Sequence, residues 1–337
     1  MSDAPIEQLS TEIVIRPVLG LPDFAPGDDL TGAILQNVPD LRDGDVLVVT
    51  SKAVSKCEGR LVRQDTGPDA RATALREQTM AVVAQRGPTT IVRNRLGLTM
   101  AAAGIDASNV TDGFIALLPE DPDASAREIR RVVEQRRGID VAVLITDTVG
   151  RPWREGLVDI AIGAAGMEAL RDLRGTVDTH GRPLAVTALA QIDEIASASE
   201  LVRGKLAEVP AAVVRGVPWR PAVEGDTGGA RQLVRPHDSD MFALGCRDVV
   251  PATASGTTEG PVPDHLIDEA IGALPQSSAK VHRTGNTVII NDESDLKTGV
   301  VIGLLLAALR AEGLAGTVNP ATGQITVSLA APYQGRV

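Results

Sequence analysis

Two short apolar segments rich in β-branched residues constrain the fold most strongly. Residues 45–50 read Asp-Val-Leu-Val-Val-Thr, and residues 140–147 read Asp-Val-Ala-Val-Leu-Ile-Thr-Asp. Apolar runs of this length, bounded by polar residues, are typical of buried strands. The first run leads into a polar segment with Ser51 and Lys56, and the second ends in Asp147. In open α/β sheets, ligands gather outside the carboxyl ends of strands, so both ends are candidates for a functional site.

The rest of the chain alternates between strand-like and helix-like segments. We expect strands at 12–18, 90–92, 184–189 and 211–215, and helices beginning near Leu30 and over 70–85, 123–138 and 193–203. This alternation predicts a mixed α/β (α+β) architecture. A segment rich in Pro, Ser, Thr and Gly at 251–261 reads as a linker. We therefore expect one domain over 1–245 and a small C-terminal α+β module over 246–337, with elements at 264–274, 287–291, 296–312 and 324–329.

Composition excludes several classes of protein. A net charge of −11 and 2% aromatic residues argue against nucleic-acid binding, which needs basic groups for phosphates and aromatic platforms for bases. The longest apolar run, 299–309, is shorter than the about 20 residues that a membrane helix needs, so we expect no membrane partner. Only Cys57 and Cys246 are present and the start has no signal-peptide pattern, which favours a cytoplasmic location.

Two carboxylates and a hydroxyl suit a divalent cation. Asp106 lies in a polar turn, Asp147 ends a buried strand and Thr148 follows it. Mg²⁺ is typically held by one or two carboxylates together with substrate phosphates. The alternative is that Asp147 caps a helix or a turn.

Basic groups near the same segments suit phosphate. Lys52 and Lys56, with the Ser51 hydroxyl, could meet phosphate oxygens, and the planar fork of Arg151 suits phosphate or carboxylate. A solvated loop for the lysines and a surface ion pair for the arginine are the alternatives. The common nucleotide and hydrolase motifs are absent from the sequence, namely the P-loop, Gly-x-Gly-x-x-Gly after the first strand, and Gly-x-Ser-x-Gly. The four histidines show no ligand spacing.

Taken together, several segments resemble one enzyme family. They are VLGLPDF (18–24), VVTSKAVSKCEGR (48–60), NRLGL (94–98), AGIDASNV (103–110), ITDTVGR (145–151), DEIA (193–196), LVRGK (201–205) and VVRG (213–216). This series is similar to the coenzyme F420:L-glutamate ligases, or gamma-glutamyl ligases, particularly the actinobacterial type. The similarity extends over about 12–245, in the family's order.

The resemblance implies a function, a fold and a set of partners. The implied reaction is GTP-dependent ligation of L-glutamate to coenzyme F420-0 through an acyl phosphate, which builds a gamma-linked oligoglutamate tail. The implied fold is a non-Rossmann mixed fold that forms an intertwined homodimer. The implied cofactors are two divalent ions, Mg²⁺ or Mn²⁺, with K⁺ as a further candidate.

The resemblance also assigns residues by position. GTP would be held by Leu21, Pro22, Asp23, Phe24, Ser51, Lys56 and Asn109. The cations would be held by Asp106, Asp147 and Thr148, with Glu194 as a further candidate ligand. Lys56 and Arg151 would supply fixed positive charge to the reaction. Lys205 falls in a family motif without an assigned role.

One departure from the family limits the prediction. Longer actinobacterial relatives carry a C-terminal, nitroreductase-like flavin domain, and the stretch after Gly245 is too short for it, so no FMN is predicted. Three alternatives stay open at this point. The acceptor could be another acidic small molecule, the chain could be a nucleotide-binding regulator without turnover, or the C-terminal module could serve binding or oligomerisation.

Overall fold

The structure is a computed structural model in which the chain divides into two compact units. One comprises residues 1–82 and 91–235, and the other comprises 83–90 and 236–337. The structure describes residues 12–64, 70–204, 207–222, 229–236, 257–258, 262–274, 280–291, 295–312, 314–319, 322 and 324–330. The predicted boundary after Gly245 and most of the predicted linker lie outside these residues.

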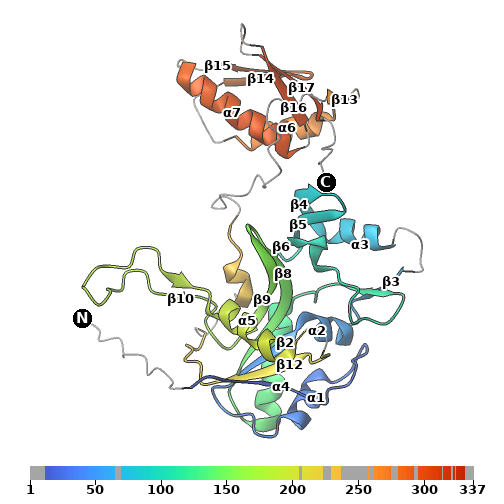
Figure 1. Ribbon diagram of the computed structural model, residues 1–337, viewed down its shortest axis with the longest axis vertical. Helices are drawn as coiled ribbons and strands as arrows, with labels where there is room; N and C mark the ends of the chain where they lie inside the picture. The colour runs from blue at the N-terminus through green and yellow to red at the C-terminus, as the bar shows by residue number, and fades with distance from the viewer. Residues whose placement is uncertain are drawn as a thin grey trace. The chain divides into compact units, whose positions relative to one another are not determined.

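A five-stranded mixed sheet forms the centre of the first unit (Figure 1). Its order is β1 (Val14–Pro17), β12 (Ala211–Arg215), β2 (Val46–Thr50), β8 (Ala142–Arg151) and β9 (Arg154–Ala165). Strands β2 and β8 run parallel, and the other neighbouring pairs run antiparallel. The two apolar runs of the sequence are therefore adjacent strands, and their carboxyl ends meet at one edge.

Alternating side chains of the two central strands enter two different hydrophobic cores. Leu47 and Val143 belong to a core with residues of α1 (Leu30–Asn37), α2 (Ser51–Cys57) and α4 (Pro122–Arg137). Val46, Val48, Ala142 and Leu144 belong to a core with α5 (Gln191–Arg203). Since successive strand residues point to opposite faces, both faces of the sheet are buried, which explains why β2 and β8 are apolar without alternation.

The ends of α4 follow the signals in the sequence. Asp121 caps its first turn by accepting from the Ala124 backbone N–H at 3.0 Å, and Gly138 ends it in a left-handed conformation with φ 66°. The amino end of α4 packs closely on β9. A Cβ on Gly163 would lie 2.3 Å from the Pro122 carbonyl oxygen, so only glycine allows this approach.

Two sequence expectations need correction. The helix expected over 70–85 ends earlier, because α3 spans Ala70–Gln78 and β4 begins at Thr79 and runs to Arg86. This strand contains Val82 and Val83 and pairs in a three-stranded sheet with the next strand, β5 (Thr89–Asn94), so strand pairing overrides the helical pattern. The strand expected at 184–189 is reduced to β11 (Ala188–Leu189), which pairs with β10 (Arg171–Asp172).

The second unit has its own core between helices and an antiparallel sheet. Its elements are β13 (Thr257–Thr258), α6 (Asp264–Gly272), β14 (Lys280–Thr284), β15 (Thr287–Asn291), α7 (Asp295–Ala311), β16 (Leu314–Val318) and β17 (Ile325–Ala330). Ile267, Leu305, Leu309 and Ile325 are fully buried there. The predicted mixed architecture of helices and strands is confirmed in both units.

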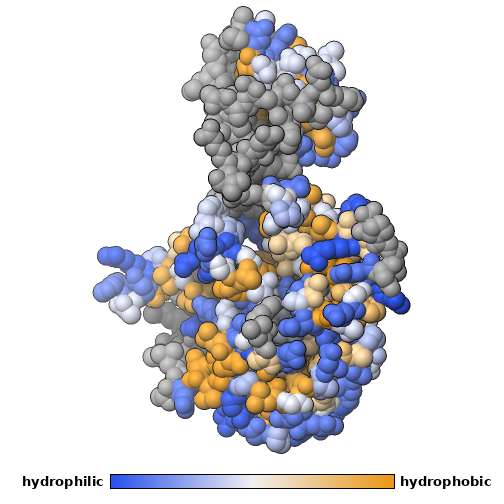
Figure 2. All heavy atoms as spheres, turned by 45° about the vertical axis from the view of Figure 1, so that its right-hand side comes forward, coloured by the Kyte–Doolittle hydropathy of each residue, from blue (hydrophilic) through white to orange (hydrophobic). Residues whose placement is uncertain are grey.

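Apolar residues gather in patches bordered by polar residues on the face of the first unit that Figure 2 shows. The small sheet of β3 (Leu61–Arg63) and β7 (Phe114–Ala116) and the hairpin strand β6 (Thr99–Ala101) complete this unit. Among the described residues, no helix has the length and apolar character required to cross a bilayer.

Candidate active site

A cavity of about 650 Å³ lies at the carboxyl ends of β2 and β8. It is lined by the turn at 21–24, the start of α2, the loop at 104–111, the end of β8 and the start of β9. Because β2 and β8 are parallel and in register from Val46 with Ala142 to Thr50 with Thr146, both ends open at the same edge. This is the location expected for a ligand site in a sheet of this kind.

Asp147 lies on β8 inside this cavity. The Ser51 hydroxyl, at the first position of α2, donates to Asp147 Oδ1 at 2.8 Å. Burial raises the pKa of Asp147 to about 7; the Ser51 hydrogen bond opposes this shift, and the neighbouring charges of Asp159 and Asp106 add to it. The surroundings of this carboxylate disfavour its ionised form, so a bound cation would stabilise it.

Asp106 lines the same cavity from a separate loop. A run of left-handed residues, Ala102, Ala103 and Gly104, turns the chain before it, and Gly104 has φ 80°. Lys52 Nζ lies 2.7 Å from Asp106 Oδ2, and the Ser108 backbone N–H and hydroxyl each donate to the carboxylate at 2.8 Å. Burial alone would raise the pKa of Asp106, but the Lys52 and Ser108 contacts outweigh it and hold the pKa at about 2.

Lys52 and Lys56 enter the cavity from α2. Thr50 caps this helix, and residues four apart on a helix share one face. Lys52 Nζ also donates to the Ser108 carbonyl oxygen at 2.5 Å, and Lys56 Nζ lies 2.5 Å from Asp23 Oδ1. The two lysine side chains are 18% and 12% exposed, so the solvated-loop interpretation is wrong for both.

The predicted nucleotide residues surround the same space. The cavity lining includes Leu21, Pro22, Asp23, Phe24, Ser51, Lys56 and Asn109. Phe24 is buried in the core, which fixes the turn, and Asn109 adopts a left-handed conformation with φ 51°. Asp106, Asp147 and Thr148 line the cavity as well.

Two predicted residues lie elsewhere. Arg151 is near the tip of the β8–β9 hairpin, where its Nη2 donates to the Glu155 carbonyl oxygen at 2.7 Å. Glu194 is exposed in the first turn of α5, while its neighbour Asp193 accepts from the Ala161 backbone N–H at 2.9 Å. Neither Arg151 nor Glu194 lines the cavity. Lys205 lies outside the described residues.

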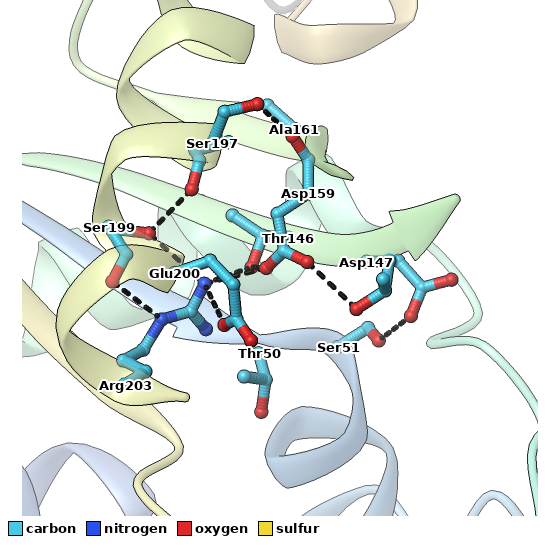
Figure 3. Close-up of polar contacts among 12 residues, drawn as sticks. Thr50, Ser51, Thr146, Asp147, Asp159, Ala161, Ser197, Ser199, Glu200 and Arg203 are labelled. Carbon is cyan, nitrogen blue, oxygen red and sulfur yellow. Dashed lines mark hydrogen bonds and ion pairs between the residues drawn. The ribbon is translucent and has the colours of Figure 1, made fainter. Parts of the chain in front are cut away.

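Sequence reasoning missed a buried polar network on the cavity wall (Figure 3). Asp159 on β9 accepts hydrogen bonds from Thr146 Oγ1 at 3.1 Å and Thr148 Oγ1 at 2.8 Å. Arg203 at the end of α5 lies 2.6 Å from Asp159, and the two side chains are 1% and 3% exposed. One signal was present, since Asp159 is a lone charge within the apolar segment Leu157–Ala165 and therefore needs a buried partner.

The donor set fits a hard cation only when a ligand completes it. Asp106, Asp147 and Thr148 offer oxygen atoms, which Mg²⁺ and Mn²⁺ favour. Across the residues that the structure describes, no group of three or more His, Cys, Asp or Glu is arranged to hold a metal ion. Mg²⁺ often keeps waters and takes substrate phosphates as further ligands, so two carboxylates and a hydroxyl are a sufficient protein contribution.

Comparison with known proteins identifies the family. A family model described as F420-0:Gamma-glutamyl ligase matches residues 19–216. The chain is 41% identical over 246 residues to the coenzyme F420:L-glutamate ligase of Methanopyrus kandleri, covering 68% of this chain and 96% of that protein. The enzymes of the same name from Methanothermobacter thermautotrophicus and Archaeoglobus fulgidus are 39% and 38% identical, over 67% and 68% of this chain and 96% of each relative. The resemblance to the actinobacterial type in particular stays a prediction. The chain belongs to the F420-0:gamma-glutamyl ligase family and is an acid–amino-acid ligase.

Proposed function

We propose that this chain ligates L-glutamate to coenzyme F420-0 and uses GTP to activate the acceptor as an acyl phosphate. The relatives carry the name coenzyme F420:L-glutamate ligase. The observation that carries the mechanism is the convergence of Asp106 and Asp147 with Lys52 and Lys56 on one cavity. Paired carboxylates beside ammonium groups are suited to a cation-bound polyphosphate.

The reaction has two balanced steps. A carboxylate oxygen of the acceptor attacks the γ-phosphorus of GTP, which forms the acyl phosphate and releases GDP. The amine of glutamate then attacks the acyl carbon, an amide bond forms, inorganic phosphate leaves and the amine loses its proton to solvent. Neither step requires a protein nucleophile, which agrees with the absence of a nucleophile motif in the sequence.

The chain's own residues position the polyphosphate and offset its charge. Asp106, Asp147 and Thr148 would hold divalent cations, which neutralise charge on the transferring phosphoryl group. Lys56, on the cavity-facing side of α2, would contact phosphate oxygens in exchange for its contact with Asp23. The turn at 21–24 and Asn109 would contact the rest of the nucleotide. Glu194 and Arg151 are left out of this set because they lie outside the cavity lining.

One assay tests the proposed function. Purified protein is incubated with GTP, Mn²⁺ or Mg²⁺, L-glutamate and F420-0, and products are followed by mass spectrometry and GDP release. We expect a mass increase of one or more glutamyl residues and GDP formation that depends on the acceptor. GDP formation with another acidic acceptor, but not with F420-0, would favour the alternative substrate class. If neither a glutamylated product nor GDP formed, the proposed GTP-dependent ligation would be wrong.

The family resemblance also leads us to propose a homodimer. Light scattering coupled to size-exclusion chromatography gives the molar mass directly. A mass near twice 35.2 kDa supports this proposal, and a monomer mass at micromolar concentration contradicts it.

A further inference from the structure

The carboxylate of Asp159 accepts three hydrogen bonds on the wall of the cavity. Its Oδ1 accepts from the Thr148 hydroxyl at 2.8 Å. Its Oδ2 accepts from the Thr146 hydroxyl at 3.1 Å and from Arg203 Nη2 at 2.6 Å. Thr148 and Asp159 stand directly opposite each other on β8 and β9, so the contact with Thr148 is built into the strand register.

Arg203 fixes this carboxylate in position. Its Nη2 also lies 3.0 Å from the Ser199 hydroxyl and 3.4 Å from Glu200 Oε2 (Figure 3). The pair of Arg203 and Asp159 is almost completely buried. Burying an ion pair gives little net stability compared with apolar packing, so stability alone explains this pair poorly. Its distinguishing feature is that it borders the cavity through Asp159.

The hydrogen-bond direction at Thr148 follows from this arrangement. A carboxylate offers acceptor oxygens only, so the Thr148 hydroxyl must be the donor and its proton points toward Asp159. The lone pairs of Thr148 Oγ1 are then directed away from Asp159. Thr148 lines the cavity, and a divalent cation binds oxygen through lone pairs and is repelled by a hydroxyl proton.

We propose that Asp159, held by Arg203, is a positioning residue that turns the Thr148 hydroxyl so that its oxygen meets a divalent cation in the cavity. The proposal rests on the proposed function, because the cation belongs to that reaction. Asp159 acts through Thr148 and does not itself contact the cation. A carboxylate behind a metal-binding group commonly fixes the orientation of that group in this way.

The isosteric variant Asp159→Asn tests the role of the carboxylate. Arg203 Nη2 requires an acceptor, so the amide oxygen would face Arg203 and the amide NH₂ would face Thr148 as a donor. Thr148 would then accept, and its own proton would be free to point into the cavity. The dissociation constant for Mn²⁺ is measured by electron paramagnetic resonance of free Mn²⁺ in the presence of a non-hydrolysable GTP analogue, with the analogue alone as the blank. We expect this constant to rise by about 10- to 100-fold.

A double-mutant cycle tests whether Asp159 acts through Thr148. Thr148→Val removes the hydroxyl oxygen and should also weaken Mn²⁺ binding, while Thr148→Ser should keep it within about threefold of the wild type. In the Thr148→Val background, Asp159→Asn should change the Mn²⁺ affinity by less than about twofold. Additive effects would overturn the proposal, because they would make Asp159 an independent ligand. Unchanged affinity in Thr148→Val would overturn it as well, even if Asp159→Asn failed to fold.

A matched control separates positioning from general damage. The Ser197 hydroxyl donates to the backbone carbonyl of Asp159 at 2.7 Å, so Ser197→Ala removes a contact to the same residue without touching its carboxylate. We expect this variant to bind Mn²⁺ as the wild type does, and equal weakening in Ser197→Ala would contradict a specific role for the carboxylate.

A kinetic readout adds to the binding data: Asp159→Asn should raise the Mn²⁺ concentration for half-maximal turnover and leave kcat at saturating Mn²⁺ within about threefold of the wild type. Absence of Mn²⁺ binding in the wild type would instead reject the cation site of the proposed function, a distinguishable failure.

Discussion

The Ser51 hydroxyl donates a hydrogen bond to Asp147 Oδ1 at 2.8 Å and so joins the first residue of α2 to β8 across 96 positions of sequence. The contact exists because β2 and β8 are parallel neighbours that end at the same edge of the sheet. It orients one oxygen of a carboxylate whose pKa burial raises to about 7.

Replacing Asp147 by Asn should lower the ligase turnover by about 100-fold or more, because a neutral amide binds a divalent cation much more weakly than a carboxylate. The measurement is GDP release with F420-0 and glutamate at saturating Mn²⁺. Asp172→Asn is the matched control, since Asp172 pairs with Arg174 outside the cavity lining. Turnover near the wild-type rate in Asp147→Asn would refute the metal role of this residue.

Titration of Asp147 should make the stability of the cation-free protein depend on pH. Burial raises the folded-state pKa of Asp147 to about 7, compared with an ordinary value of about 4, so the folded state binds this proton more tightly than the unfolded state does. The contribution of Asp147 to stability is therefore present below about pH 4 and is lost as the pH rises to about 7. Urea unfolding in EDTA gives the free energy of unfolding between pH 5 and 8. This free energy should fall less with rising pH in Asp147→Asn than in the wild type. The same pH dependence in both proteins, or a steeper fall in Asp147→Asn, would contradict the raised pKa.

Lys56→Met should raise the KM for GTP by about tenfold or more, because an ammonium group held inside the cavity would no longer contact the polyphosphate. Lys280→Met is the control, since Lys280 is an exposed residue of β14 in the second unit. Initial rates at varied GTP give KM and kcat separately. A change confined to kcat would place Lys56 in the transfer step and not in ground-state nucleotide binding.

Cys57 should react slowly with iodoacetamide in the folded protein at pH 8. Burial raises the pKa of its thiol to about 11, and the nearby charges of Asp28 and Glu58 add to the shift. The thiolate is the reactive species, and at pH 8 only about one thiol in 10³ is ionised. Mass spectrometry of a Cys246→Ser chain isolates this site, and addition of urea should accelerate labelling strongly. Fast labelling of the folded chain would show that the thiol is more accessible than the structure indicates.

A chain that ends at Gly245 should keep its ligase turnover within about fivefold, because the described residues that line the cavity all lie between Leu21 and Pro210 in the first unit. Circular dichroism checks that the shortened chain folds, and light scattering reports whether its association state changes. A folded chain without turnover would assign the C-terminal module a part in catalysis. A change of mass alone would support its role in oligomerisation.

The sequence by itself determined the elements whose signals are local. The apolar runs at 45–50 and 140–147 predict buried strands because only a two-sided core accommodates such segments. The helix predicted over 123–138 matches α4 to within one residue at each end, because capping depends on residues within one turn. A carboxylate at the end of a buried strand, Asp147, was a good functional candidate for the same local reason.

Only the tertiary structure decided which side chains meet. Strand β9 carries Gly156 and Gly163 and shows no simple alternation, so the sequence does not show the register of the β8–β9 hairpin that places Asp159 opposite Thr148. The end of α3 at Gln78 depends on the pairing of β4 with β5. The opposite pKa shifts of Asp106 and Asp147 depend first on the deeper burial of Asp147, and then on where Lys52 lies, since this ammonium group pairs closely with Asp106. Residue type supplies the chemistry, whereas burial and charge around each group are properties of the folded arrangement.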